Sequence, residues 1–189
     1  YAVHLPGNAP TATYLRGEDG NDSVAGSAAF DDVNGNKGAD TIDGGSGGND
    51  WLLGGQDNDL ITAHASNNLI YGNLGADTLI GGTGADTIRG GQDNDIITGG
   101  AGNDFLAGDR GNDTLTGGAG ADIFHFFSGA GLERVTDFSL AEGDRVQLLP
   151  GTQYSVAQIG ADTVISIAGG DQMVLVGVSL SAGSWIFGA

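Results

Sequence analysis

Apolar and polar residues recur with a period of nine through the middle of the chain. From Gly72 to His125 six blocks follow one another without insertion: GNLGADTLI, GGTGADTIR, GGQDNDIIT, GGAGNDFLA, GDRGNDTLT and GGAGADIFH. Glycine opens every block, aspartate is sixth and a large apolar residue is eighth. A period this regular indicates one structural unit repeated along the chain.

The same period extends towards the N-terminus and begins at Gly17. Block 26–34 lacks glycine at its second and fourth positions, and block 44–53 has one extra glycine. Block 63–71 has no glycine, and Asn68 stands in the place of the aspartate. Of the twelve blocks between Gly17 and His125, all are apolar at position eight and eleven have aspartate at position six.

Each block fits a short strand and a turn. Its last three residues suit a strand whose middle side chain points inward, and the six residues before them suit a glycine-rich turn with positive φ. The eighth residues of successive blocks would then stack into an apolar column. One block cannot bury its strand alone, so only the array is stable. The pattern therefore predicts an all-β fold, a parallel β-solenoid with two blocks in each coil.

The rest of the chain does not follow the period. Residues 1–16 are expected to form an extended segment or linker, with an edge strand around Thr11–Leu15. Residues 126–189 are expected to form a C-terminal β cap over the end of the 17–125 coil, with strands at Val146–Leu149, Thr163–Ala168 and Gln172–Val178. Because the chain begins at Tyr1 without a signal-peptide pattern, we interpret it as a fragment or processed product.

Charge and composition narrow the classes of partner. The chain has 24 acidic and 6 basic residues, a net charge of −18, which disfavours nucleic acid and anionic membrane surfaces and favours cations. It has no cysteine, which excludes disulfides and thiolate metal sites. It also has no apolar run long enough to span a membrane. The three histidines share no ligand spacing and no catalytic motif occurs, so we expect a protein without enzymatic activity.

The position-six aspartates predict a calcium protein. With two blocks in each coil, they form two rows in which neighbouring residues lie about 4.8 Å apart. Carboxylates that close repel each other unless a cation lies between them, and ligand sets made only of oxygen favour Ca²⁺ over zinc, copper or magnesium. Row 1 is Asp22, Asp40, Asp59, Asp77, Asp95 and Asp113; row 2 is Asp31, Asp50, Asn68, Asp86, Asp104 and Asp122.

The blocks resemble GGxGxDxUx, the repeat of the RTX (hemolysin-type) calcium-binding proteins. The resemblance implies a right-handed parallel β-roll of about twelve half-turns with multiple Ca²⁺ ions between its turns. It implies that the sixth-position aspartates and the carbonyls of the glycine-rich turns hold the ions. The corresponding glycines here are Gly17, Gly35, Gly72, Gly75, Gly81, Gly84, Gly90, Gly99, Gly102, Gly108, Gly111, Gly117 and Gly120. We expect five good sites in row 1, and weaker sites in row 2 at Asn68 and at block 26–34.

The segment after the repeats also resembles this family. Glu133–Phe138 (ERVTDF), followed by Gly143 and Asp144, is similar to the region that follows the repeats, although the family usually has aspartate in the place of Glu133. The resemblance implies a cap that carries an uncleaved type I secretion signal. It therefore implies a secreted protein, extracellular or at the cell surface of a Gram-negative bacterium.

These observations lead to one main hypothesis with two versions. The chain would be a structural module that folds on binding extracellular Ca²⁺. It would serve surface assembly, as a homo-oligomer, S-layer, filament or adhesin component, or it would be the C-terminal module of a secreted enzyme such as a protease or lipase. The even-numbered blocks place an apolar patch outside the coil, and this patch either binds a partner or is covered by the cap or the N-terminal segment. The patch comprises Trp51, Leu53, Leu69, Tyr71, Phe105 and Ile123.

Overall fold

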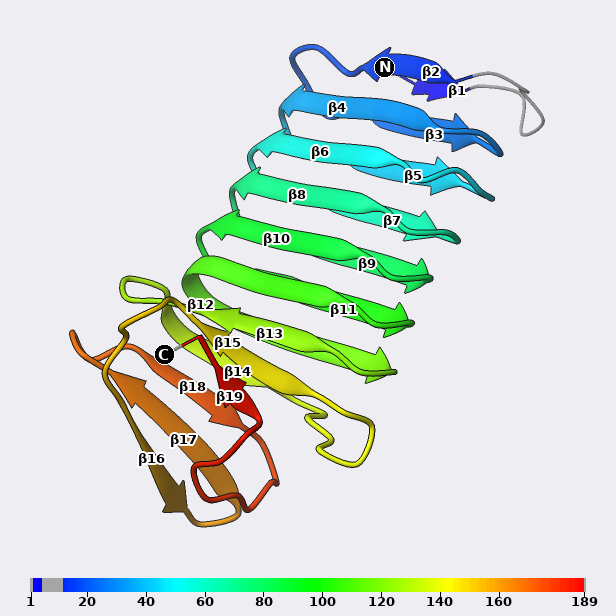
Figure 1. The fold of residues 1–189 in the computed structure, drawn as a ribbon. Coiled ribbons are helices and arrows are strands. Elements are labelled where there is room, and N and C mark those ends of the chain that lie inside the picture. The colour runs from blue at the N-terminus through cyan, green and yellow to red at the C-terminus, as the bar shows by residue number, and fades with distance from the viewer. Residues whose placement is uncertain (1, 5–11, 189) are drawn as a thin grey trace.

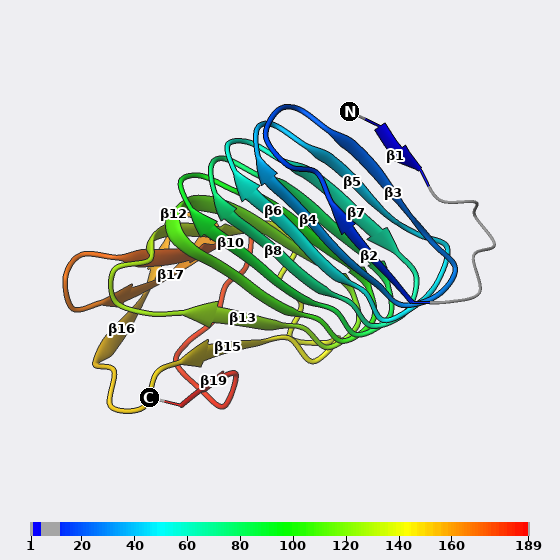
Figure 2. The ribbon, with the colours of Figure 1, turned by 90° about the horizontal axis from the view of Figure 1, so that it is seen from above.

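The chain winds into a coil of two facing parallel β-sheets (Figure 1). The computed structural model describes residues 2–4 and 12–188, and none of these residues is helical. Figure 2 shows the sheets on opposite sides of flattened loops, so that each coil contributes one strand to each sheet. The parallel β-solenoid predicted from the sequence is thus confirmed. At about eight turns it is longer than the twelve half-turns expected, because strands beyond His125 continue the parallel stacking.

The strands alternate between the sheets along the chain. Sheet A contains β1 (Ala2–His4), β3 (Ser23–Ser27), β5 (Thr41–Gly45), β7 (Leu60–His64), β9 (Thr78–Thr83), β11 (Ile96–Ala101), the second half of β12 (Phe105–Ala119), β14 (Gly131–Val135) and β18 (Gln172–Leu175). Sheet B contains β2 (Thr13–Arg16), β4 (Asp31–Lys37), β6 (Trp51–Gln56), β8 (Leu69–Leu74), β10 (Thr87–Gln92), the first half of β12, β13 (Ile123–Phe126), β15 (Arg145–Leu148) and β19 (Ile186–Phe187). Antiparallel strands β17 (Asp162–Ile167) and β16 (Tyr154–Ile159) extend sheet A from β18.

The strands are longer than the three residues expected. Strands β9 and β10 each have six residues, because the two glycines that open a block belong to the strand and not to the turn. Alternation then points positions six, eight and one of successive blocks into the coil. Positive φ falls instead at positions two and four, as at Gly82 (111°) and Gly84 (119°), where the chain reverses direction.

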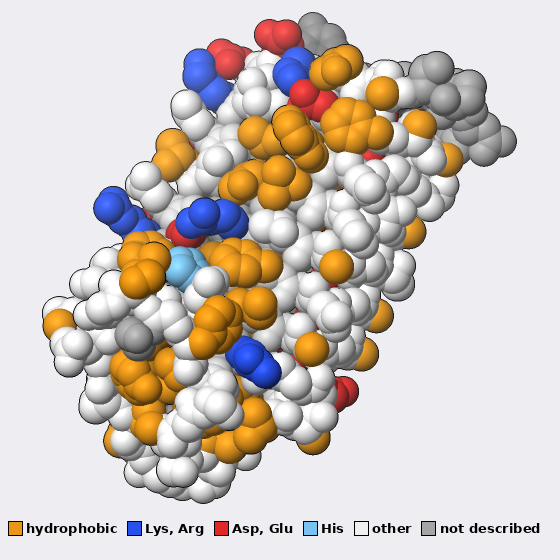
Figure 3. All heavy atoms as spheres, viewed as in Figure 1, with side chains coloured by type: hydrophobic (Ala, Val, Ile, Leu, Met, Phe, Trp, Pro, Cys, Tyr) orange, Lys and Arg blue, Asp and Glu red, His pale blue; other side chains and the backbone are white. Residues whose placement is uncertain are grey.

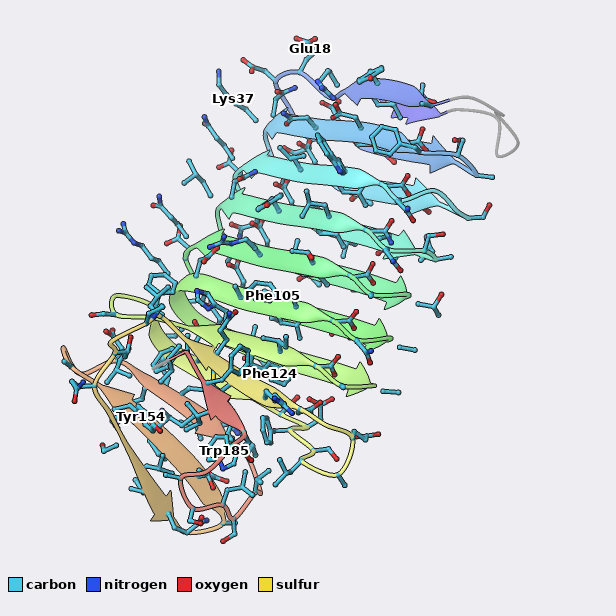
Figure 4. The ribbon with its side chains drawn as sticks, viewed as in Figure 1. Glu18, Lys37, Phe105, Phe124, Tyr154 and Trp185 are labelled. Atoms are coloured by element: carbon cyan, nitrogen blue, oxygen red, sulfur yellow. The ribbon has the colours of Figure 1, made fainter. Side chains whose placement is uncertain are left out.

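The eighth residues form the predicted apolar column. Each is at most 1% exposed, and they come alternately from the two sheets: Val24, Val33, Ile42, Leu52, Ile61, Ile70, Leu79, Ile88, Ile97, Leu106, Leu115 and Phe124. Aromatic rings continue the column into the C-terminal strands, since Phe138 lies 6.0 Å from Phe124 and 5.8 Å from Trp185 between ring centroids (Figure 4). The repeats and the C-terminal strands therefore share one core.

The C-terminal region partly follows the expected pattern. Strands β15, β17 and β18 confirm the three expected strands with small shifts at their ends, whereas β16 was not predicted. The edge strand expected around Thr11–Leu15 is observed as β2, and Thr11 lies outside the described residues. Among residues 2–4 and 12–188 there is no helix of the length and apolarity needed to cross a membrane.

The apolar patch lies on the outer face of sheet B. Figure 3 shows hydrophobic side chains gathered over this face, interrupted by arginine. Trp51 is 52% exposed, and the other five members of the patch are partly exposed. The described part of the C-terminal region continues the two sheets beyond the end of the coil, and the patch stays accessible.

Candidate metal centre

The position-six residues lie where each turn enters the next strand. All eleven aspartates and Asn68 are buried, with at most 4% of their surface exposed. They point inward because they stand two residues before the apolar residue of the same block. Each turn thus buries a carboxylate beside the apolar column.

Hydrogen bonds join these residues into two rows. The backbone N–H of each donates to the side-chain Oδ1 of the residue one coil further, as from Asp59 to Asp77 (2.7 Å) and from Asp77 to Asp95 (2.8 Å). Row 1 runs in this way from Asp22 to Asp113, and row 2 from Asp31 through Asn68 to Asp122. The rows follow from the coil of two blocks, and one oxygen of each acceptor carboxylate is satisfied by the chain.

The second carboxylate oxygen, Oδ2, has no hydrogen-bond donor in most of the blocks. In nine aspartates it is buried and accepts no hydrogen bond from the described residues: Asp40, Asp50, Asp59, Asp77, Asp86, Asp95, Asp104, Asp113 and Asp122. An unpaired buried anion is strongly unfavourable. These oxygens therefore need a positive group that the protein itself does not supply.

The glycines at position one make room for this oxygen. A Cβ atom on Gly72 would collide with Oδ2 of Asp77, and those on Gly81 and Gly90 would collide with the aspartates of their own blocks. Space, and not positive φ, is therefore what position one requires. The expected position-one glycines are buried, and all except Gly17, which directly follows β2, lie inside strands. The position-four glycines Gly75, Gly84, Gly102 and Gly120 have positive φ in the turns. Gly111 has no such φ, because β12 passes through this turn as one continuous strand.

The described residues contain no cluster of three or more acidic, histidine or cysteine side chains that could hold a metal. An ion beside Oδ2 would therefore take most of its ligands from backbone carbonyls. Single carboxylates with carbonyl oxygens make a hard, oxygen-only donor set, which fits Ca²⁺.

Asn68 shows what replaces the second oxygen in the irregular block. Its Nδ2 donates to the carbonyl oxygens of Ala65 (3.0 Å) and Ser66 (2.9 Å) and to Oδ1 of Asp86 (3.0 Å). The N–H donors of this amide thus take the place that Oδ2 occupies in the aspartates of other blocks. They satisfy two turn carbonyls directly, so this turn needs no cation.

Asp31 is the second exception. Ser27, which replaces glycine at position two of its block, donates to Oδ2 of Asp31 from its backbone N–H (2.7 Å) and from its hydroxyl (3.0 Å). Both carboxylate oxygens of Asp31 are therefore close to donors of the chain. Blocks 26–34 and 63–71, the two that lack glycines of the repeat, are thus the two in which the chain supplies these donors.

Both rows continue into the C-terminal strands, which the period of nine does not predict. The β12–β14 register places Glu133 beside Asp113, and Asp122 donates from its N–H to Oδ1 of Asp144 (2.9 Å). Glu133 and Asp144 each precede an inward apolar residue by two positions, Val135 and Val146. This acidic-x-apolar spacing was the signal available in the sequence, although the intervals to the preceding aspartates are no longer regular.

Burial raises the pKa of the nine aspartates with an unpaired Oδ2 above the ordinary value of 3.8, although the amide hydrogen bonds oppose it. The pKa rises to about 8 for Asp95, to about 7 for Asp50 and Asp59, and to about 6 for Asp77 and Asp104. Neighbouring carboxylates add to the rise at Asp95 and Asp59. In the absence of a cation, these groups therefore keep their protons to higher pH than free carboxyl groups do.

A family model matches the repeats, and solved structures with some similarity to the chain are known. The family model of the RTX calcium-binding nonapeptide repeat matches the chain four times, at residues 16–48, 45–79, 71–106 and 98–130. Similar solved structures include the AlgE6R3 subunit of the Azotobacter vinelandii mannuronan C5-epimerase, with 26% identity, a TM-score of 0.44, and coverage of 71% of this chain and 79% of that one. The extracellular lipase LipA from Serratia marcescens has 19% identity and a TM-score of 0.40, and the match covers 95% of this chain but 40% of the lipase. No curated protein sequence matches the chain.

The raised pKa values predict an unusual pH dependence for the protein stripped of Ca²⁺. Between about pH 4 and pH 8 the folded chain binds protons that the unfolded chain has lost, so its free energy of unfolding should fall as pH rises. Circular dichroism in metal-free buffers should show more β structure, or a higher midpoint of thermal unfolding where a transition is seen, at about pH 5 than at about pH 8. A midpoint that rises with pH would show that the carboxylates are stabilised as anions without a cation. Saturating Ca²⁺, which competes with the protons, should reduce or reverse the dependence.

Asn68 gives a prediction for the number of bound ions. We expect Asn68→Asp to bind at least one more Ca²⁺ per chain, because it restores Oδ2 in row 2. Without Ca²⁺ this variant should be less stable than the wild type, since it loses three donated hydrogen bonds and buries a charge. Metal analysis after equilibrium dialysis gives the count. Asn67→Asp is the matched control, because it adds the same charge at an exposed neighbouring position. Equal counts in the two variants would contradict the role assigned to the Asn68 amide.

Proposed function

The chain belongs to the RTX calcium-binding nonapeptide repeat proteins, and we propose that it is a non-enzymatic structural module that folds when Ca²⁺ fills its turns. The observation that carries the proposal is the set of nine buried Oδ2 atoms without a donor. Among the described residues, these oxygens are the repeated buried group for which the protein provides no hydrogen-bond donor. Their number and regular spacing argue for many equivalent ions.

The nine aspartates with unpaired Oδ2 atoms and the turn carbonyls would hold these ions. The carbonyls at positions three and four are the natural partners, because they are the ones that the Asn68 amide engages in the irregular block. The hydrogen bonds to Oδ1 fix the orientation of each carboxylate, and the glycine at position one leaves space beside Oδ2. Asp31 lies outside this set, since Ser27 already donates to its Oδ2. Bound Ca²⁺ supplies the positive charge that lets the carboxylates remain ionised in the interior.

Folding would therefore depend on the Ca²⁺ concentration. Without the ion, a chain with a net charge of −18 repels itself and must bury carboxylates to form the coil. Each site stabilises the folded state by about 2.7 kcal/mol when free Ca²⁺ is 100 times its dissociation constant, and many sites act together. Low calcium inside the cell would keep the chain unfolded for export, and millimolar calcium outside would drive folding. This scheme suits an extracellular protein or one on the cell surface.

The proposal is tested by removing and restoring Ca²⁺. Far-UV circular dichroism should show loss of the β spectrum in EGTA and its return when Ca²⁺ exceeds the chelator. Mg²⁺ at the same concentration is the control and should restore less structure, because it prefers rigid octahedral sites with several waters. A β spectrum at neutral pH that neither EGTA nor Ca²⁺ changes would sink the proposal.

Assembly into larger structures is the biological role that the fold favours. Strand β16 pairs on one side with β17 and forms the outer edge of the antiparallel extension in both ribbon views (Figures 1 and 2). Its sequence, YSVAQI, has no charge, proline or glycine, and five of its six residues are exposed. Tyr154, at its start, is 37% exposed, and Ile159 is 61% exposed. Proteins usually protect such an edge with charges or bulges, because it can pair with another strand.

Charge favours a second copy of the chain as the strand that pairs with β16. Residues 145–189 contain Arg145, Asp162 and Asp171, a net charge of −1, whereas the remaining residues carry −17 of the net −18. Two chains repel least when they approach through their C-terminal strands. Antiparallel pairing of β16 with β16 would join two sheets into one by β-augmentation.

The assembly role is tested by measuring mass in Ca²⁺. Light scattering after size exclusion should show dimers or larger species for the wild type and monomers for a Ser155→Lys, Ala157→Lys double variant. A Ser181→Lys, Ser184→Lys variant adds the same charge at exposed positions away from β16 and should associate like the wild type. A wild type that stays monomeric at all concentrations would reject assembly. It would favour the alternative role, a folding and secretion module of a secreted enzyme.

A further inference from the structure

The two rows of position-six residues end differently. Row 2 ends at Asp144, which is buried and uses both carboxylate oxygens: Oδ1 accepts the N–H of Asp122 (2.9 Å), and Oδ2 accepts the N–H of Ser139 (2.7 Å). Backbone N–H groups thus satisfy both oxygens of the last carboxylate in this row. No cation is needed there.

Row 1 ends at Glu133, and there the chain provides no such donors. Glu133 is 0% exposed, and neither of its carboxylate oxygens accepts a hydrogen bond from an N–H or O–H group of the described residues. Parallel pairing of β12 and β14 places it directly beside Asp113, whose Oδ2 is also buried without a donor. The charged groups that act on Glu133 from the surrounding turns, Asp113, Asp109 and Asp95, are also acidic.

Two adjacent buried carboxylates can be compensated in two ways. They can share a proton, as acid pairs do, or they can share a cation. A shared proton would link Glu133 to Oδ2 of Asp113, whose Oδ1 already accepts the N–H of Asp95, and would leave the second oxygen of Glu133 buried without a partner. A divalent ion can contact several of these oxygens and neutralises both charges. The longer side chain of Glu133 also carries its carboxylate further from its own backbone than an aspartate would.

We infer that Asp113 and Glu133 form a Ca²⁺ site with two carboxylate ligands at the junction of the repeats and the C-terminal strands. The inference rests on the proposed function and extends it beyond the nonapeptide repeats. Where another carboxylate of the rows leaves an unpaired oxygen it leaves only Oδ2, whereas Glu133 leaves both, so this site offers an ion more free oxygens and binds it more tightly. Since β14 pairs with β12 on one side and β18 on the other, the ion joins the repeats to the C-terminal strands.

The inference is tested on the full chain with Glu133→Gln, in which the side chain keeps its shape and loses its charge. Equilibrium dialysis at limiting free Ca²⁺, followed by metal analysis, should show that the tightest binding step of the wild type is lost, because Asp113 alone then offers one unpaired oxygen, as the other row aspartates do. Asp144→Asn is the matched control at the end of row 2 and should keep this binding step. Glu133→Met removes the second buried carboxylate, so it should also lose the tightest binding step, yet stay folded at lower Ca²⁺ than the wild type.

The outcomes separate this inference from the proposed function. A tightest binding step that is unchanged in both Glu133 variants would overturn the inference. An equal loss in Asp144→Asn would also overturn it, because the contrast between the two row ends would then be wrong. A wild type that binds no Ca²⁺ would instead reject the proposed function itself.

Discussion

Burial of one carboxylate in almost every turn is the constraint on which the rest of the coil depends. Each carboxylate ties neighbouring coils together, because its Oδ1 accepts the backbone N–H of the preceding residue in the row. The same geometry leaves Oδ2 in the interior without a partner. The glycine at position one follows from this constraint, since any larger residue would occupy the space beside Oδ2. The same carboxylates therefore link the coils through Oδ1 and destabilise the fold through the unpaired Oδ2 until a cation binds.

Blocks 26–34 and 63–71 support this interpretation, because in them the chain itself supplies the missing donors. Asn68 presents an amide nitrogen where an aspartate would leave an oxygen, and Ser27 brings two donors to Asp31. In both cases the glycine pattern is lost at the same place where hydrogen-bond donors appear. A block can therefore depart from the repeat when it supplies its own positive group, and the coil continues through it. Loss of the aspartate or the glycines alone would leave carbonyls or a carboxylate without a partner.

Much of the fold could be predicted because it depends on spacing alone. A period of nine with apolar residues at position eight determines the coil, the apolar column and the two rows of acids. Strand length could not be predicted, because the two opening glycines extend the strand through contacts with Asp side chains that only the coil creates. Strand β16 was missed because it is largely exposed and lacks the alternation of a half-buried strand. Glu133 and Asp144 were missed as row members because longer loops separate them from the repeats.

The two ends of the molecule are stabilised by different interactions. In the repeats, each coil adds one apolar residue per sheet and also buries charge. Beyond His125 the aromatic contacts of Phe138 with Phe124 and Trp185 enlarge the core, and Asp137 accepts two backbone N–H groups from Gly117 and Gly118 (2.9 and 2.8 Å). These interactions need no cation. With one ion between Asp113 and Glu133, the C-terminal strands can order first and present the last coil as a template, because each further coil then closes only a short loop onto an existing edge. Order would spread from there towards the N-terminus as successive turns take up calcium.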